Sequence, residues 1–486
     1  MSGPSGTNPT FLWLDYETSG ADPRRDRPLQ FAAWRTGPDL EPVEEPVTLW
    51  CAPPIDRLPS PDAGMITGIA PQDVGDKGLP EADFAAAVQG LLAQPGTCGV
   101  GWNSIRFDDE FTRCLLYRNF HDPYAREWEH GNSRWDLIDL ARLCYALRPD
   151  GIEWPRREDG APSFRLEDLA RANGLVHRQA HDAFGDVEAT LALGRLLRAR
   201  QPRLFEWHYG LRQKRRALEQ LDWVGMMPVL HASQRFPAAR GCLAMVVPLA
   251  EHPRNRNGVI VYDLSVPPDD LIALDADDLL DRVFTAGRDL PEDLARVPLK
   301  LVQANRSPAL APLSTLRGVD TARIGLDVEA CQRHLEQMRA ADGIAAKVRE
   351  VFARADAGRA PATDPELALY DGFLPDGDKP LLRRVRATPP AQLGSEDFPF
   401  ADPRYPELLF RYRAVNWPQT LSPPERARWR MQRQRRLLGH DDAVTLNLER
   451  YEARIAELRA TATGSRLALL DRYLDWGRQL TAEFAP

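Results

Sequence analysis

Four acidic residues and one histidine in the first 200 residues are the side chains best suited to catalysis. Asp15 and Glu17 follow the apolar run FLWL, Asp108 lies in GWNSIRFDDEF, and Asp186 comes five residues after His181 in AHDAFGDVEAT. Side chains two apart on a strand point to the same face, separated by about 6.6 Å along the backbone, so Asp15 and Glu17 can converge on one cation. An isolated Asp-x-Glu is more often an exposed strand end, so the interpretation depends on its companions.

This set of groups matches what two-metal phosphodiester hydrolysis requires. Two divalent ions about 3.5 to 4 Å apart would activate a water and stabilise the leaving oxygen, and oxygen-rich ligands favour Mg²⁺ or Mn²⁺ over zinc. His181, with an ordinary pKa near 6.5, can accept a proton from the attacking water. Asp109 could cap the following helix while Asp108 faces the site. The expected reaction is hydrolysis rather than group transfer.

The first 200 residues alternate strand-like and helix-like patterns, which predicts an α/β domain. FLWL, QFAAWRT and TCGVGW are expected strands, and Asp182 to Arg200 is an expected helix. Loops that follow strands in such sheets carry functional groups at the carboxyl edge. Asp108 and the Asp15–Glu17 pair are therefore expected at one edge of the sheet.

The pattern changes after Gln201. Short β-rich runs between about Met226 and Asn305 predict a small β-barrel or sandwich with a helical insert. The Gly/Pro/Ala segment near Asp356 indicates a linker, and helical periodicity follows from roughly Glu366. We predict a flexible leader at 1–10, an α/β domain at 11–200, a β domain at 201–355 and a helical domain at 356–486.

Composition excludes several classes of protein. The 486 residues are 43% hydrophobic with a net charge of -8, and no apolar stretch reaches the roughly 20 residues of a spanning helix. The first ten residues lack a signal-peptide pattern, so a cytoplasmic protein without membrane contact is expected, and six scattered cysteines predict reduced thiols. Two segments, Arg195–Arg216 and Arg404–Arg436, are strongly basic, as a solvated face or a phosphate-binding surface would be.

The acidic motifs and His181, in this order, resemble the DEDDh superfamily of 3′ to 5′ exonucleases, which share a ribonuclease H-like fold. WLDYETSG, DRPLQFAAWRT, PSFRLEDLARANG and VPLKLVQANRSPALAP further resemble bacterial exonuclease I, a single-strand-specific exodeoxyribonuclease. The similarity is strong from Phe11 to Phe352. It implies a ribonuclease H-like exonuclease domain, an SH3-like β-barrel and an α-helical C-terminal domain.

The resemblance also implies a reaction and a site. The chain would hydrolyse single-stranded DNA from its 3′ end to 5′-mononucleotides in DNA repair and recombination, as a monomer near the nucleoid. Asp15, Glu17, Asp108 and Asp186 would hold two Mg²⁺, with Mn²⁺ as a substitute, and His181 would be the general base. Aromatic residues near the motifs, including Tyr124, could stack bases, although such residues are more often core. The expected DNA contacts are Tyr16, Thr18, Trp102, Asn103, Arg106, Phe107 and Arg165.

The family also binds the acidic C-terminal tail of single-stranded DNA-binding protein in a basic pocket. Arg148 and Arg317 occupy matching positions of that pocket. At two other positions of the pocket this chain does not match the family, because Met227 and Pro312 are uncharged. An exoribonuclease or oligonucleotide scavenger is the first alternative, disfavoured by the long extension after Gln201. A non-catalytic single-strand-binding module is a remote alternative because all five catalytic positions are intact.

Overall fold

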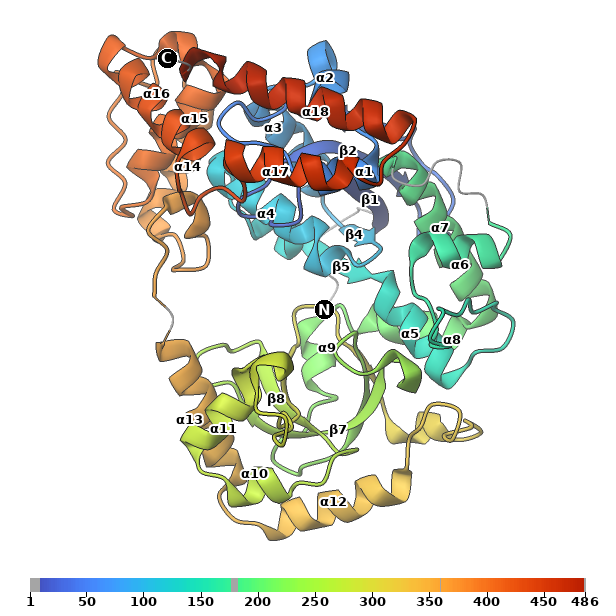
Figure 1. Ribbon diagram of the computed structural model, residues 1–486. Coiled ribbons are helices and arrows are strands. Elements are labelled where there is room, and N and C mark those ends of the chain that lie inside the picture. The colour runs from blue at the N-terminus through green and yellow to red at the C-terminus, as the bar shows by residue number, and fades with distance from the viewer. Residues whose placement is uncertain (1–8, 176–181, 359, 485–486) are drawn as a thin grey trace. The chain divides into compact units, whose positions relative to one another are not determined.

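The computed structural model describes residues 9–175, 182–358 and 360–484. The chain divides into two compact parts (Figure 1). The first comprises Met1–Ser133, Arg178–Glu188 and Pro361–Pro486, and the second comprises Arg134–His177 and Ala189–Ala360. The C-terminal helices therefore share a compact part with the beginning of the chain, while the domain boundaries predicted from sequence stay predictions.

A mixed sheet of order β3-β2-β1-β4-β5 forms the centre of the first part. Of β5, only the first residue, Ser133, belongs to this part. β1 pairs antiparallel with β2 and parallel with β4, and β2 pairs antiparallel with β3. The three predicted strands are confirmed as β1, β2 and β4. The strands are β1 (Thr10–Thr18), β2 (Pro28–Thr36), β3 (Val47–Trp50), β4 (Thr97–Gly101) and β5 (Ser133–Asp136).

The alternation of side chains along β1 decides which face carries the chemistry. Leu12, Leu14 and Tyr16 share a buried apolar cluster with residues of α3 and α4. Asp15 and Glu17 alternate with them and so project from the opposite face. The helices on the N-terminal side of the chain are α1 (Pro61–Thr67), α2 (Pro71–Val74), α3 (Glu81–Leu92), α4 (Asp108–Arg118) and the start of α7 (Ala183–Arg200).

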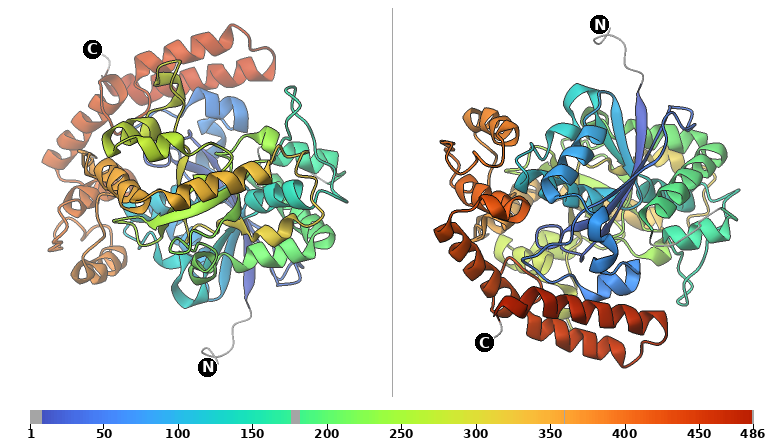
Figure 2. Two further views of the ribbon diagram at one scale, coloured as in Figure 1. Left: turned by 90° about the horizontal axis from the view of Figure 1, so that it is seen from below. Right: turned by 90° about the horizontal axis from the view of Figure 1, so that it is seen from above.

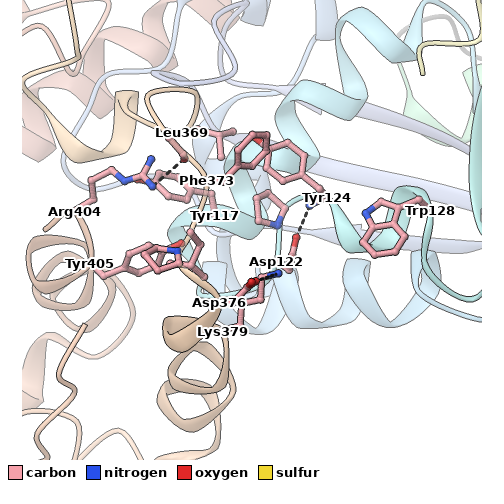
Figure 3. A pocket seen from close by; sticks show the side chains of 14 residues that line it. Tyr117, Asp122, Tyr124, Trp128, Leu369, Phe373, Asp376, Lys379, Arg404 and Tyr405 are labelled. Carbon is pink, nitrogen blue, oxygen red and sulfur yellow. Dashed lines mark hydrogen bonds and ion pairs between the residues drawn. The ribbon is translucent and has the colours of Figure 1, made fainter. Parts of the chain in front are cut away.

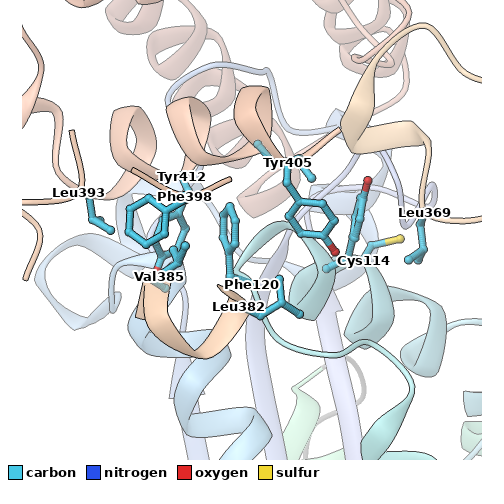
Figure 4. Close-up of a cluster of buried hydrophobic side chains, with 12 residues drawn as sticks. Cys114, Phe120, Leu369, Leu382, Val385, Leu393, Phe398, Tyr405 and Tyr412 are labelled. Carbon is cyan, nitrogen blue, oxygen red and sulfur yellow. The ribbon is translucent and has the colours of Figure 1, made fainter. Parts of the chain in front are cut away.

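Five C-terminal helices complete the first part and pack against it through two apolar clusters. In one cluster, Tyr117 of α4 and Phe120, just after this helix, meet Tyr405 and Tyr412 of α15 (Figure 4). In the other, α17 and α18 pack beside α1 and α2 (Figure 1). The helices are α14 (Lys379–Ala387), α15 (Tyr405–Asn416), α16 (Pro423–Leu438), α17 (Leu448–Arg459) and α18 (Ser465–Thr481), which confirms the predicted helical region.

A second, antiparallel sheet of order β10-β6-β7-β8-β9 forms the core of the second part. Helices α12 and α13 pack along β7 (Figure 2). The strands are β6 (Val229–Ala232), β7 (Leu243–Glu251), β8 (Gly258–Asp263), β9 (Leu299–Gln303) and β10 (Ala309–Ala311). The helices besides most of α7 are α5 (Leu137–Leu147), α6 (Leu166–Ala172), α8 (Pro202–Gly210), α9 (Lys214–Leu218), α10 (Asp269–Ala273), α11 (Ala276–Phe284), α12 (Val328–Ala340) and α13 (Ile344–Ala357).

A buried ionic network includes two arginines of the basic C-terminal segment. Glu366, which is 6% exposed, lies within ion-pair distance of four arginines. The distances from its carboxylate are 2.5 Å to Arg27, 2.9 Å to Arg57, 3.3 Å to Arg411 and 3.4 Å to Arg436. Arg411 and Arg436 thus serve the packing of the first part rather than a solvated face.

One smaller expectation from the sequence, the free thiols, is confirmed. All six cysteines are buried free thiols. Among the described residues, no helix combines the length and the apolar character needed to cross a membrane.

Candidate active site

Asp15, Glu17 and Asp186 come together in the first part. One ligand atom from each of these carboxylates lies within 4.8 Å of the other two. Asp15 and Glu17 come from the same face of β1, and Asp186 from the first turn of α7. The sequence spacing predicted this convergence, because a strand end and a helix that starts beside it can supply carboxylates to one point.

Gln30 positions the start of α7 beside β1. Gln30 lies opposite Glu17 in the register of β1 and β2, and it is 2% exposed. Its side-chain amide donates to Asp182 Oδ1 at 3.0 Å, and its side-chain oxygen accepts from the Ala183 amide at 3.1 Å. This residue was missed in the sequence analysis, and the available signal was a glutamine within the apolar strand QFAAWRT.

Asp108 is fixed next to Asp15 by the backbone of β1. It is the first residue of α4 and is buried, and its Oδ1 accepts a hydrogen bond from the Tyr16 amide at 3.1 Å. A carboxylate at a helix N-terminus is favoured by the helix dipole. The neighbouring Asp109 makes a buried ion pair with Arg126 at 2.6 Å, a contact that the sequence did not indicate.

Burial and mutual repulsion make these carboxylates hard to ionise together. Burial, followed by the charges of Asp108, Asp186 and Glu17, raises the pKa of Asp15 well above its ordinary value. Burial and the charges of Asp186 and Asp182 raise the pKa of Glu17 to about 8. A divalent cation relieves this repulsion, and carboxylate oxygens are the ligands that Mg²⁺ and Mn²⁺ prefer. The donor set therefore fits a divalent metal ion.

The remaining predicted residues fall into several places. His181 lies outside the described residues. Trp102, Asn103, Arg106 and Phe107 form the connection between β4 and Asp108, and each is partly buried. This connection lies at the carboxyl end of β4, directly before the acidic cluster.

Three other predicted DNA contacts differ in exposure. Tyr16 is 3% exposed and packs on Phe31 with ring centroids 4.8 Å apart, so its side chain belongs to the core. Thr18 is also buried, and its hydroxyl donates to the Gly20 carbonyl at 2.7 Å. Arg165 precedes α6 in the second part, and its side chain is 77% exposed.

The two arginines predicted to bind a protein tail lie side by side in the second part. Arg148 donates to the Arg317 carbonyl at 3.4 Å. Arg148 also lines a cavity of about 530 Å³ together with Arg203, Leu204 and Trp207. Pro312 and Ala311 complete its apolar wall. The cavity thus combines guanidinium groups with an apolar surface.

A mixed sheet that presents three clustered carboxylates beside a helix fits a nuclease domain whose acidic side chains could hold a divalent cation. Comparison with protein families supports this class along the whole chain: residues 12–193 match the family described as "Exonuclease", residues 212–354 the "Exonuclease I SH3-like domain" and residues 363–480 the "Exonuclease I C-terminal domain". The exodeoxyribonuclease I of Escherichia coli strain K12 is 44% identical over 93% of this chain and 96% of its own length.

Solved structures agree with this assignment. The exonuclease I of Methylocaldum szegediense superimposes with a TM-score of 0.92 at 48% identity, covering 97% of this chain and 99% of the other. The E. coli exonuclease I in complex with a dA16 oligonucleotide superimposes with a TM-score of 0.91 at 43% identity, covering 97% and 100%. The chain belongs to the exonuclease I family and is an exodeoxyribonuclease I-like enzyme. The predicted exonuclease, SH3-like and helical C-terminal regions are confirmed.

Proposed function

We propose that this chain is a divalent-metal-dependent exonuclease that removes 5′-mononucleotides from the 3′ end of single-stranded DNA. The observation that carries the proposal is the cluster of Asp15, Glu17 and Asp186, within 4.8 Å of one another, in a chain that matches exonuclease I over nearly its full length. The E. coli relative has been crystallised in complex with single-stranded DNA, which supports the substrate class. By the same resemblance we propose a monomer that acts in DNA repair and recombination at the nucleoid.

Each residue of the site has a defined task in this proposal. Asp15, Glu17, Asp108 and Asp186 would hold two Mg²⁺ ions. When bound, such a pair of cations lowers the pKa of an attacking water and stabilises the leaving oxygen. The Tyr16 amide orients Asp108, and Gln30 orients the helix that carries Asp186. His181 would accept the proton of the attacking water. The connection 102–107 would contact the terminal nucleotides because it leads directly into Asp108.

The proposal is tested by incubating the protein with end-labelled oligonucleotides in Mg²⁺ or in chelator. We expect label at the 3′ end of single-stranded DNA to be released as a 5′-mononucleotide in Mg²⁺ only, with duplex DNA degraded far more slowly. Mn²⁺ is expected to replace Mg²⁺. Faster digestion of RNA than of DNA would instead indicate an exoribonuclease or oligonucleotide scavenger. DNA binding without release of label would indicate a binding module.

We further propose that the cavity beside Arg148 binds the acidic C-terminal tail of single-stranded DNA-binding protein. Arg148 and Arg203 would pair with its carboxylates, while Leu204, Trp207 and Pro312 would contact apolar side chains.

Replacing Arg148 with alanine is expected to weaken binding of a fluorescent acidic tail peptide by about tenfold, since a hydrogen bond to a charged group contributes about 1.5 to 3 kcal/mol. Fluorescence anisotropy measures the affinity, and cleavage of bare DNA should stay at the wild-type rate. Arg215→Ala is the matched control, because Arg215 is 90% exposed on α9 and lies outside the lining of this cavity. Equal peptide affinity of Arg148→Ala and the wild type would contradict the assignment.

A further inference from the structure

Strand β2 presents three side chains on the face of the sheet that carries the acidic cluster. Gln30 lies opposite Glu17, and Ala32 lies opposite Asp15, in the register of β1 and β2. Residues directly opposite each other in an antiparallel pair share a face, and the period of two along the strand adds Trp34. β2 therefore faces both the carboxylates of β1 and the start of α7.

Two of these side chains contact the start of α7. The ring of Trp34 lies 5.9 Å from that of Phe184, in the first turn of the helix. The side-chain amide of Gln30 donates to Asp182 Oδ1 at 3.0 Å, and its oxygen accepts from the Ala183 amide at 3.1 Å. The apolar contact holds the helix on the sheet without direction, whereas the two hydrogen bonds fix the position and the rotation of its first residues.

The position of Asp182 determines the position of Asp186. The Asp182 carbonyl accepts a hydrogen bond from the Asp186 amide at 3.1 Å, at the start of the helix. Residues four apart lie on one face of a helix, about 6 Å from each other along its axis. A shift at Asp182 therefore displaces the Asp186 carboxylate from the two carboxylates of β1, which lie within 4.8 Å of it.

An amide side chain suits position 30 because it makes both contacts without adding charge. Asp182 needs a donor and the Ala183 amide needs an acceptor, and glutamine carries both on one neutral group. An ionised glutamate cannot donate, and a lysine or arginine cannot accept. Neutrality matters because burial, followed by the charges of Asp186 and Asp182, already raises the pKa of Glu17 to about 8. A carboxylate at position 30 would face the carboxylate of Asp182 directly.

The carboxylate on the other helix is held by separate contacts. Asp108 begins α4, and its Oδ1 accepts from the Tyr16 amide of β1 at 3.1 Å. At the far end of α4, the ring of Tyr117 lies 5.9 Å from that of Tyr405, beside a cavity of about 470 Å³ (Figure 3). None of these contacts involves β2. Loss of the contacts that β2 makes with α7 therefore leaves Asp108 in place.

We propose that Gln30 and Asp182 form a clamp that fixes Asp186 in its place and thereby sets the affinity of the acidic cluster for a divalent cation. This inference rests on the proposed function and assigns Gln30 to it as a positioning residue. A ligand that is in place before the cation arrives need not be ordered on binding, so less binding free energy is lost. The clamp thus acts on the metal affinity, and not on the rate once the metal is bound.

The test measures Mn²⁺ binding to the full chain without DNA, from the paramagnetic resonance signal of the free ion. Gln30→Met keeps the length of the side chain and removes both hydrogen bonds. We expect the Mn²⁺ affinity to fall by about 10- to 100-fold, the usual result of losing a group that orients a metal ligand. Trp34 and Phe184 still hold the helix on the sheet, so the variant should fold. Wild-type Mn²⁺ affinity of Gln30→Met would overturn the clamp.

A second pair of variants separates the clamp from electrostatics and uses polar side chains only. Gln30→Glu adds a negative charge beside the cluster, which by itself would tighten cation binding. The clamp predicts instead a loss of about tenfold or more, because an ionised carboxylate cannot donate to Asp182. Adding Asp182→Asn exchanges donor and acceptor across the same contact and should restore the affinity to within about threefold of the wild type. Tighter binding by Gln30→Glu, or no recovery in the double variant, would contradict the proposal.

Cleavage data distinguish the clamp from the proposed function. Gln30→Met should need about 10- to 100-fold more Mg²⁺ for half-maximal release of a 3′ label, and should approach the wild-type rate at saturating Mg²⁺. Gln72→Met is the matched control, because Gln72 of α2 donates to the Arg472 carbonyl at 2.8 Å, a contact that does not involve α7. This control should bind Mn²⁺ like the wild type. If the wild type binds Mn²⁺ but releases no nucleotide, the proposed function fails, while the Mn²⁺ affinities of the variants still test the clamp.

Discussion

Replacing Asp15 with asparagine is expected to lower the rate of 3′-end cleavage by at least about 10³-fold, with the fold intact. Burial, followed by the charges of Asp108, Asp186 and Glu17, raises the pKa of Asp15 well above its ordinary value. Asparagine keeps the shape but removes the charge that holds a divalent cation. Charge stabilisation by bound metal contributes several kcal/mol to the transition state, and about 4 kcal/mol corresponds to 10³-fold. Single-turnover release of a 3′ label in Mg²⁺ measures the effect.

The control for this variant is a neighbouring acid outside the tight cluster. Asp182 also raises the pKa of Asp15 and Glu17, but it is not among the three carboxylates that lie within 4.8 Å of one another. Asp182→Asn keeps an oxygen that can accept from Gln30, so it should reduce the rate by about tenfold or less. Equal losses in Asp15→Asn and Asp182→Asn would show that general electrostatics, and not metal ligation, explains the defect.

The Asp15→Asn variant should be more stable than the wild type when metal is absent. Glu17 has a pKa of about 8 in the folded protein against an ordinary value of 4.5, so the metal-free protein loses stability as the pH rises between these values. The pKa of Asp15 is itself raised by burial and by the charges of Asp108, Asp186 and Glu17, so removing its ionisable group should remove its share of this loss and raise stability near neutral pH by about 1 to 2 kcal/mol. Thermal unfolding in chelator at several pH values measures it, and added Mg²⁺ should stabilise only the wild type.

The sequence could predict the elements and the acidic cluster because both depend on short-range patterns. FLWL identifies β1 by its apolar run, and the period of two places Asp15 and Glu17 on one face. The helical spacing after Asp182 identifies α7, with Asp186 in its first turn. These patterns can be recognised in a single sequence because each residue's role follows from its immediate neighbours.

The parts that the sequence could not predict depend on contacts between distant residues. β3 and β5 have four residues each, too few for alternation to distinguish them from loops. The role of Gln30 depends on an amide 153 positions away, and Arg27 meets Glu366 across 339 positions. The spacing between such partners carries no periodic signal. The grouping of the C-terminal helices with the exonuclease sheet was missed for the same reason.

Glu366→Gln is expected to destabilise the first part by about 3 to 5 kcal/mol, because it leaves a buried cluster of guanidinium groups without its central anion. Burial alone would raise the pKa of Glu366, but Arg436, Arg57, Arg27 and Arg411 together hold that pKa well below its ordinary value. The carboxylate therefore stabilises the folded protein above about pH 4.5 and loses this contribution as the pH falls. Urea unfolding at pH 7 and pH 4 measures both effects, and the variant should show the weaker dependence on pH.

An exposed ion pair that joins the same two ends of the chain provides the control. Asp62 and Arg454 lie 2.7 Å apart with side chains 46% and 41% exposed. Because solvent screens this pair, Asp62→Asn should cost only about 0 to 1 kcal/mol. Burial, and not the presence of a bridge, is therefore the cause of the expected difference. If the two variants unfold at the same urea concentration, the buried network contributes no more than a surface pair, and the apolar clusters alone hold the C-terminal helices on the exonuclease sheet.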